Sequence, residues 1–241
     1  IEKPDIYLNS NIIGTFNIIE LAKKINVRHL IIGSSSSVYG ANTKFPFKEI
    51  DKTDHQISFY AATKKSTESM AHSYSSLWKV PITMLRFFTV YGPWGRPDMA
   101  YFKFTKSILN EEPIDVYNNG KMKRDFTYID DIVHGVINLL DQPPINNINN
   151  ISNSKAPFRI LNIGNNNPVS LKKFIKIIEK ERSKKAIKNN LPMQPGDVLE
   201  TYADIVDINK LIGFKPSTSI EEGLKKFIDW YKEYSSSKRN I

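Results

Sequence analysis

Helical and strand-like patterns alternate along the first part of this chain. Residues 7–25 place apolar side chains three or four positions apart, as an amphipathic helix does, at Leu8, Ile12, Phe16, Ile19 and Ala22. The next apolar run, 28–33, ends in a glycine and four serines, which is typical of a buried strand that enters a loop. A second helix is predicted over 57–78 and a second strand over 82–88. This order predicts parallel βαβ units with helices on both faces of a sheet.

The second half of the sequence has shorter and less regular patterns. Its predicted elements are a rigid loop at 91–97, helices near 99–109 and 130–140, strands at 114–117, 124–128 and 159–164, and an Asn-rich loop at 143–154. Ser170 is predicted to cap a lysine-rich helix, and Ser219 with Glu222 to form a capping box for the last helix. From Ser235 onwards we expect a polar tail.

Composition excludes several classes of protein. None of the 241 residues is Cys, which excludes disulfides, zinc-thiolate sites, iron–sulfur clusters and thiol nucleophiles. No segment resembles a signal peptide or is apolar for long enough to span a bilayer, so we expect a cytoplasmic protein with no membrane partner. The formal net charge is +9, but the 27 lysines are spread over predicted helix faces, most densely in 172–188. Their helical spacing favours a solvated helix face over a nucleic-acid partner.

A Tyr-x-x-x-Lys pair on a helix can make a phenol usable as a proton acceptor. The two side chains lie one turn apart on one face, where the ammonium lowers the pKa of the tyrosine. With 11 Tyr and 27 Lys in the chain, about one match is expected by chance. The chain contains three, and two of them, Tyr117/Lys121 and Tyr234/Lys238, fall in a predicted turn and the predicted tail. Tyr60/Lys64 opens a long helix after a serine-rich strand end, where parallel sheets bind ligands.

Four ordered motifs carry a resemblance to a known family. They are residues 33–40 (GSSSSVYG), 60–64 (YAATK), 86–93 (RFFTVYGP) and 124–131 (RDFTYIDD), preceded by 9–15 (NSNIIGT). With these motifs the chain resembles the extended short-chain dehydrogenase/reductases, and within them the NAD-dependent nucleotide-sugar epimerases and dehydratases. Residues 86–100 look like the loop of the UDP-glucuronate 4-epimerases, the group in this family that the chain resembles most. The resemblance implies an α/β fold with a Rossmann-like doubly wound parallel sheet and a smaller α+β substrate domain. It implies that 1–90, with segments near 129–165, belong to the NAD-binding domain, and that 91–241 mainly bind the nucleotide sugar.

The resemblance also implies roles for individual residues. Ser35 would hydrogen-bond the reacting oxygen, with Ser37 as the competing serine, Tyr60 would be the acid/base, and Lys64 its electrostatic partner. The residues implied to contact NAD are Asn11, Ser34, Tyr60, Lys64 and Phe87. If the predicted helix with Tyr60 and Lys64 were absent, the four serines would be interpreted as an ordinary polar loop.

Substrate residues are implied in the second half of the chain. Arg124 would clamp a diphosphate, Tyr117 would lie beside uracil, Asp197 would hold the nucleoside, and Thr89 and Arg96 would face a sugar carboxylate. A guanidinium fork suits phosphate and carboxylate oxygens. The bland alternatives are an ion pair of Arg124 with Asp125 or Asp130, a loop-anchoring role for Arg96, and ordinary strand or turn residues at 117 and 197.

The reaction implied by these residues is epimerisation of a UDP-sugar at carbon 4 through a 4-keto sugar. Dehydratases of the family carry an Asp-Glu pair where this chain has Ser36 and Ser37, so dehydration is disfavoured. A cation near the sugar favours UDP-glucuronate and UDP-galacturonate, and UDP-N-acetylhexosamine or UDP-glucose is the alternative. A homodimer is expected by resemblance only, and a role in polysaccharide precursor supply is expected from the class of substrate only.

The glycine-rich turn that holds a dinucleotide pyrophosphate is absent from this sequence. None of its eleven glycines lies in such a pattern between a strand and a helix. The resemblance places the helix that follows Ile1 midway through the cofactor domain, so we expect two or three βαβ units, roughly 60 to 100 residues, to be missing before Ile1. The choice between NAD and NADP stays open, and so does the alternative that the chain is an inactive fragment or an interaction remnant.

Overall fold

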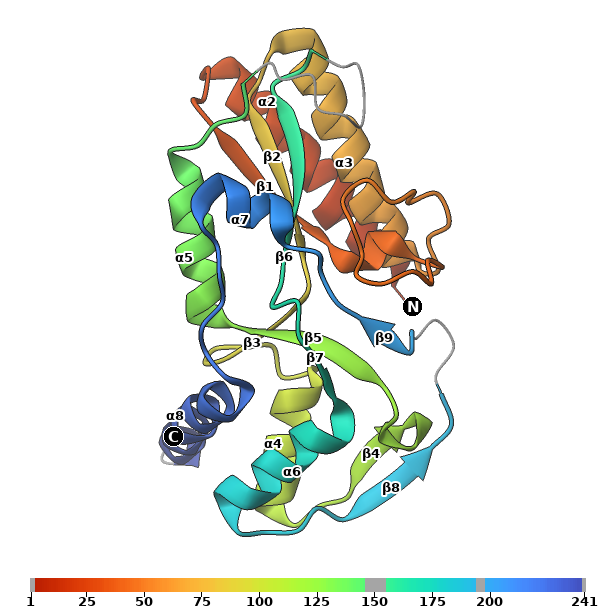
Figure 1. Cartoon of the computed structure of the whole chain (residues 1–241), viewed down its shortest axis with the longest axis vertical. Helices are drawn as coiled ribbons and strands as arrows, with labels where there is room; N and C mark the ends of the chain where they lie inside the picture. The colour runs from red at the N-terminus through yellow and green to blue at the C-terminus, as the bar shows by residue number, and fades with distance from the viewer. Residues whose placement is uncertain (1–2, 146–154, 194–197, 240–241) are drawn as a thin grey trace. The chain divides into compact units, whose positions relative to one another are not determined.

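The computed structural model describes residues 3–145, 155–193 and 198–239 (Figure 1). Its elements in chain order are α1 (Pro4–Tyr7), the π-helix η1 (Leu8–Ile13), α2 (Gly14–Lys24), β1 (Leu30–Ser35), the 3₁₀ turn η2 (Ser36–Tyr39), α3 (Phe59–Trp78), β2 (Ile82–Phe87), β3 (Thr89–Tyr91), α4 (Ala100–Asn110), β4 (Ile114–Tyr117), the 3₁₀ turn η3 (Asn118–Gly120), β5 (Lys123–Tyr128), α5 (Ile129–Leu140), β6 (Phe158–Ile163), β7 (Pro168–Ser170), α6 (Leu171–Arg182), β8 (Lys188–Leu191), β9 (Glu200–Thr201), α7 (Val206–Ile212) and α8 (Ile220–Arg239).

The chain divides into two compact units. Unit 1 comprises Ile1–Phe88, His134–Ile163 and Ala203–Phe214, and unit 2 comprises Thr89–Val133, Gly164–Tyr202 and Lys215–Ile241. The return of 203–214 to unit 1 has no counterpart in the patterns of the sequence. Which ligand each unit binds remains a proposal, taken up below.

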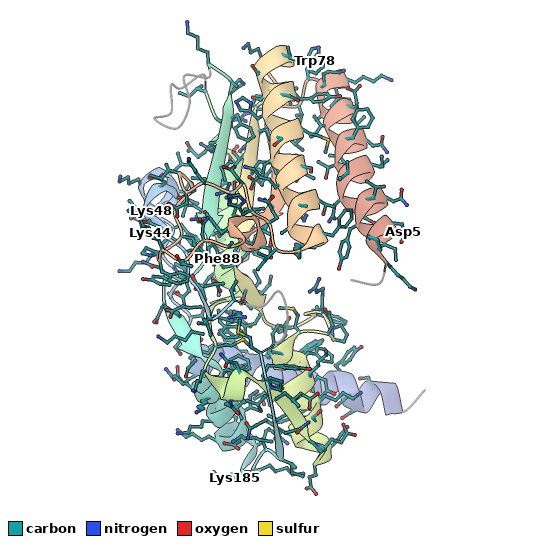
Figure 2. All side chains as sticks on the ribbon, turned by 90° about the vertical axis from the view of Figure 1, so that its right-hand side faces the viewer. Asp5, Lys44, Lys48, Trp78, Phe88 and Lys185 are labelled. Atoms are coloured by element: carbon teal, nitrogen blue, oxygen red, sulfur yellow. The ribbon has the colours of Figure 1, made fainter. Side chains whose placement is uncertain are left out.

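Unit 1 is built on a parallel sheet in the order β1-β2-β6. Strand β2 lies in the middle, and five of its six residues are buried. The three strands run in register, so Leu30, Ile82 and Phe158 lie side by side at their amino ends. Figures 1 and 2 show α2 and α3 on one face of this sheet and α7 on the other. The predicted α/β class with a Rossmann-like parallel sheet is confirmed.

The core of unit 1 follows from the helical spacing of the first segment. Ile19 and Ala22 of α2 are buried together with Ala71 of α3 and with Ile82 and Met84 of β2. Their burial fixes which faces of the two helices turn towards the sheet. The predicted helix over 7–25 is present as α1, η1 and α2, but the sequence did not indicate its π-helical stretch.

The described residues of unit 2 combine short strands with the helices α4, α6 and α8. Strands β3, β5 and β7 form one sheet, to which β9 adds beside β5, and β4 pairs with β8. Helices α4, α6 and α8 bury one aromatic-rich cluster against these strands, including Tyr91, Phe126, Phe174 and Phe227. At Gly223 of α8, a Cβ atom would lie 2.1 Å from the Tyr91 hydroxyl, so only glycine allows this close approach.

The last helix corrects one prediction. The polar tail expected from Ser235 is wrong, because α8 continues to Arg239. The hydroxyls of Ser235, Ser236 and Ser237 donate to main-chain carbonyls three or four residues earlier, which keeps them compatible with a helix. The Ser219 cap is present, with its Oγ accepting from the Glu222 N–H at 3.1 Å.

Thr105 on α4 offers a test of the unit 2 core. Its hydroxyl is fully buried and has no hydrogen-bond partner among the described residues. A buried polar group without a partner costs free energy. We therefore expect Thr105→Val to raise the free energy of unfolding by about 1 kcal/mol, measured by urea denaturation.

Thr67 provides the matched control for that change. It is also a buried helical threonine, but its Oγ1 donates to the Lys64 carbonyl at 2.7 Å. Thr67→Val should therefore bring no gain in stability. A loss of stability in Thr105→Val would mean that its hydroxyl is satisfied in the folded protein.

Candidate active site

The carboxyl ends of β1 and β2 form one end of the unit 1 sheet. Ser35 and Phe87 are the last residues of the two strands and lie opposite each other. The Phe87 ring lies beside Gly33, where a Cβ atom would be 3.3 Å from it. Figure 2 shows Phe88 far from Trp78, the last residue of α3, so α3 begins at the same end at which the strands finish. Ligands of open α/β sheets bind at this end.

Ser35 ends β1 and caps the turn that follows. Its Oγ accepts a hydrogen bond from the Ser37 N–H at 3.1 Å, which closes η2. Because Ser35 serves as an acceptor there, its own O–H proton is available for another oxygen. Ser35 is buried, whereas Ser37 is exposed.

Tyr60 and Lys64 lie one turn apart at the start of α3. Ser58 begins this helix by accepting from the Ala61 N–H at 3.1 Å. The Lys64 ammonium donates to the Gly33 carbonyl at 2.9 Å, and this half-buried position lowers the pKa of Lys64 through desolvation. The half-buried Tyr60 ring meets the ring of Tyr7 edge-on at 5.5 Å between centroids.

The π-helix η1 is joined to the turn that carries Tyr60. Asn11 donates from its side-chain amide to Thr63 Oγ1 at 2.9 Å, and Thr63 Oγ1 donates to the Tyr60 carbonyl at 2.8 Å. Single π-helical turns occur frequently at functional sites. Here the turn brings Asn11 to the first turn of α3, where its amide contacts the helix.

Ser34 lies within a buried polar network. Its hydroxyl donates to Glu68 Oε1 at 2.7 Å, and Glu68 also binds Arg86 Nε and Nη2, both at 2.9 Å. Burial would raise the pKa of Glu68, but the hydrogen bonds from Arg86 and Ser34 hold it below its usual value. The sequence predicts Ser34 as a cofactor contact, and the structure places its hydroxyl on Glu68.

The other side of Arg86 continues this network. The guanidinium lies over the Tyr39 ring at 4.7 Å, and its Nη1 donates to the Glu49 carbonyl at 3.4 Å. Tyr39 donates to Asn162 Oδ1 at 2.6 Å, and the Asn162 N–H donates to Glu49 Oε1, also at 2.6 Å. Sequence reasoning missed Glu49, Glu68 and Asn162. The one available signal was that Glu68 follows Lys64 by four residues, on the same helix face.

Unit 2 holds a pocket of about 210 Å³ that brings three predicted substrate residues together. Thr89, Tyr117 and Arg124 line it, with an otherwise largely apolar wall. Arg124 Nη1 donates to the carbonyls of Val198 and Lys123 at 2.8 and 3.0 Å. Its Nη2 lies 3.5 Å from the sulfur of Met122, another residue of the pocket wall.

Arg96, another predicted substrate residue, does not line this pocket. Arg96 is exposed in the loop before α4, where its Nη2 lies 3.3 Å from an oxygen of Asp98 and 3.3 Å from the sulfur of Met99. Asp197 lies outside the described residues.

The comparisons with known proteins give the family. The model of the NAD dependent epimerase/dehydratase family matches residues 1–153. The chain belongs to this epimerase/dehydratase family. Protein CapI of Staphylococcus aureus is 54% identical over 240 residues, which cover 97% of this chain and 72% of that protein. A probable UDP-glucuronate 4-epimerase of Rhizobium meliloti is 50% identical over 241 residues, covering 97% and 70%.

A solved structure of another epimerase superposes on the fold. The UDP-glucuronic acid 4-epimerase of Bacillus cereus, in complex with UDP-glucuronic acid and NAD, has a TM-score of 0.84 and 34% identity. The match covers 94% of this chain and 68% of that one. The predicted relationship to nucleotide-sugar epimerases is therefore confirmed, and NAD is the cofactor of the family.

The residues at the end of the epimerase sheet fit part of NAD. Lys64 uses one ammonium proton on Gly33, which leaves two donors for ribose hydroxyls, and the Tyr60 phenol can donate or accept. The sequence contains no glycine-rich turn for the pyrophosphate. The donor set thus suits the nicotinamide riboside half of the dinucleotide. Within the described part of the chain, no helix is long and apolar enough to cross a membrane.

Proposed function

We propose that this chain carries the catalytic residues of an NAD-dependent UDP-sugar 4-epimerase that interconverts UDP-glucuronate and UDP-galacturonate. The observation that carries the proposal is the placement of Tyr60 and Lys64 on the first turns of α3, with Lys64 bonded to Gly33 at the end of β1. Ser35 lies two residues after Gly33 on the same strand end. These three side chains supply a proton acceptor, a fixed positive charge and a hydrogen-bond donor.

Tyr60 acts as general base and then as general acid in this proposal. Its phenolate takes the proton from the sugar O4, and the Lys64 ammonium stabilises the phenolate by its charge. Ser35 donates to O4, since its lone pair already serves the Ser37 N–H. Bound NAD supplies a hydride acceptor that later returns the hydride to the other face of the keto sugar. Tyr60 then gives the proton back to O4.

The choice of epimerisation over dehydration rests on what the serine cluster lacks. Elimination of water needs a further acid and base, and Ser36 and Ser37 carry no carboxyl group. Ser37, which is assigned to the substrate, belongs to unit 1, and the other residues assigned to it belong to unit 2. Arg124 would bind the diphosphate, Tyr117 would lie beside uracil, and Thr89 and Arg96 would bind the carboxylate. Asp197 stays assigned to the nucleoside.

The direct test is an assay of the chain with NAD and four substrates: UDP-glucuronate, UDP-galacturonate, UDP-glucose and UDP-N-acetylglucosamine. Products are separated by anion-exchange chromatography. We expect the two uronates to interconvert. Conversion of only the neutral sugars would overturn the uronate assignment, and no conversion of any of the four by a folded chain would favour the inactive fragment.

Arg96 gives a sharper test of the uronate assignment. Hydrogen bonds to charged groups contribute about 1.5–3 kcal/mol, so we expect Arg96→Gln to lower kcat/KM for UDP-glucuronate roughly 10–100-fold. Activity on UDP-glucose, where present, should change little, because a neutral sugar has no carboxylate for the guanidinium. The measurement is steady-state kinetics on both sugars.

Arg28 is the matched control for Arg96. It is equally exposed and lies 3.6 Å from an oxygen of Asp141, much as Arg96 lies beside Asp98. Arg28→Gln removes the same charge from unit 1 at the amino end of β1. It should leave the kinetics unchanged. Equal losses in both variants would show a general charge effect and contradict the role of Arg96.

We further propose a homodimer and a cytoplasmic enzyme that supplies polysaccharide precursors. The dimer is supported by large apolar side chains exposed on the helices of unit 1, including Ile6, Phe59, Leu77 and Trp78. Exposed apolar side chains mark an interaction surface where they gather into one patch. The pathway follows from the class of substrate alone.

A further inference from the structure

One buried carboxylate, Glu68 on α3, holds the ends of two neighbouring strands. Its Oε1 accepts from Ser34 on β1 at 2.7 Å and from Arg86 Nε on β2 at 2.9 Å, and its Oε2 accepts from Arg86 Nη2 at 2.9 Å. Ser34 and Arg86 are paired residues in the parallel register. Lys65 Nζ adds a fourth contact, 3.5 Å from Oε2. A single side chain therefore fixes both strand ends to one turn of α3.

This network is adjacent to Lys64 and Ser35, two residues of the proposed catalytic set in unit 1. Glu68 follows Lys64 by one helical turn, and Ser34 lies between Gly33, which accepts from Lys64, and Ser35. The bonds Lys64–Gly33 and Glu68–Ser34 thus join successive turns of α3 to successive residues of β1. Their combined effect sets the distance between the start of α3 and the end of β1.

Stability alone is a weak reason for such a network. Removing two charges from water is costly, and a buried ion pair often contributes no more than well-packed apolar side chains would. Glu68 is 2% exposed and Arg86 1% exposed, so both bear this cost in full. The hydrogen bonds of Glu68 also fix the orientation of the groups that they join, which apolar packing would not do.

We propose that Glu68 is a positioning residue of the active site, whose carboxylate holds Ser34 and Arg86 so that Ser35 stays in register with Tyr60 and Lys64. The effect that we expect on kcat rests on the proposed function. It also reassigns Ser34, from a contact of the cofactor to the link between Glu68 and β1. Glu68 itself is too deeply buried to touch a ligand, so it acts only through the residues that it holds.

The test removes the hydrogen bond between Ser34 and Glu68 and keeps the ion pair between Glu68 and Arg86. Ser34→Ala deletes the hydroxyl and leaves Glu68 bound to Arg86, and Ser34→Thr keeps a hydroxyl as the rescue variant. The matched control is Thr83→Val in the first half of β2. Thr83 is also a buried hydroxyl bonded to charged or polar partners, His29 Nε2 at 2.8 Å and Arg159 Nε at 2.9 Å, but it lies towards the other end of the sheet.

Two measurements distinguish a positioning role of Ser34 and Glu68 from a role in stability alone. Misplacement of reacting groups by about 1 Å can cost 10²-fold in rate, so Ser34→Ala should lower kcat by about tenfold or more, with KM for the UDP-sugar within about twofold. Ser34→Thr should recover most of the rate, and Thr83→Val should keep kcat within about twofold of the wild type. The second readout needs no activity: the rate at which an amine-selective reagent labels Lys64, followed by mass spectrometry. It should rise severalfold in Ser34→Ala only, since Lys64 loses its fixed place beside Gly33.

Each outcome decides the inference. Unchanged kcat and unchanged Lys64 labelling in Ser34→Ala would overturn it, and so would equal changes in Thr83→Val. A raised KM with kcat unchanged would return Ser34 to a direct binding role. If the wild-type chain epimerises none of the sugars, the proposed function fails, and the labelling of Lys64 still decides whether Glu68 and Ser34 position it.

Discussion

Tyr60→Phe is expected to lower kcat for UDP-sugar epimerisation about 10²–10⁴-fold, the range that a positioned general acid–base group contributes. The change removes one oxygen from a half-buried ring and leaves its edge-on contact with Tyr7 in place. Folding should therefore be unaffected, and circular dichroism and thermal unfolding should match the wild type. KM for the UDP-sugar should change far less than kcat, because the other residues assigned to the substrate are unchanged in this variant.

Tyr74 on the same helix is the matched control. Its hydroxyl donates to Glu20 Oε1, and it lies more than three turns after Tyr60. Tyr74→Phe makes the same chemical change away from the strand ends and should leave kcat within about twofold. A Tyr60→Phe variant with wild-type kcat would contradict the whole acid–base assignment, including the roles of Lys64 and Ser35.

Local patterns predicted most of the elements. The strand at 114–117 matches β4, and the helix over 57–78 differs from α3 by two residues at its start. The four residues of β4 show the period of a strand, because the buried Ile114 and Val116 alternate with Asp115 and Tyr117. Short strands such as β7 and β9 were missed because two or three residues show no period, and their pairing with β5 comes from residues far along the chain.

The three Tyr-x-x-x-Lys pairs show how context decides a motif. Tyr117 ends β4 and is followed by a turn in which Asn118 and Asn119 have positive φ, as the sequence predicts. Tyr234 differs, because the backbone is helical through 238 and the expected tail is absent. Tyr234 packs on Trp230 and Phe102 in the aromatic cluster of unit 2. Place in the fold, and not helicity alone, distinguishes Tyr60.

Buried polar partners were beyond the reach of sequence reasoning. Glu68 meets Arg86 across 18 positions and Glu49 meets Asn162 across 113, and no spacing rule links residues so far apart. Each of these groups looks like an ordinary surface residue in the sequence, since Glu and Arg are rarely buried without a partner. The motif that contains Arg86 was found, but its partner on α3 was not.

Glu49 gives the second large expected effect, a pH dependence of stability. Burial raises the pKa of Glu49 to about 7, and the nearby carboxylates of Asp207 and Asp204 add to this rise, while the Asn162 N–H opposes it. The folded chain therefore holds a proton on Glu49 at pH values where the unfolded chain, with a pKa near 4.5, has lost it. The free energy of unfolding must then fall as the pH rises from about 4.5 through 7.

Glu49→Gln should remove this dependence, because Gln keeps an oxygen for the Asn162 N–H and carries no charge. A difference of 2.5 pKa units corresponds to an upper bound of about 3 kcal/mol, so the variant should equal the wild type below pH 4.5 and exceed it by up to that amount at pH 8. Urea unfolding across this pH range measures the difference. Glu112→Gln, at an exposed site of unit 2, is the control. Its free energy of unfolding should change with pH in the same way as that of the wild type. A constant offset between Glu49→Gln and wild type at every pH would contradict the titration of Glu49, whereas a gap that opens between pH 5 and 7 would identify it as the titrating group.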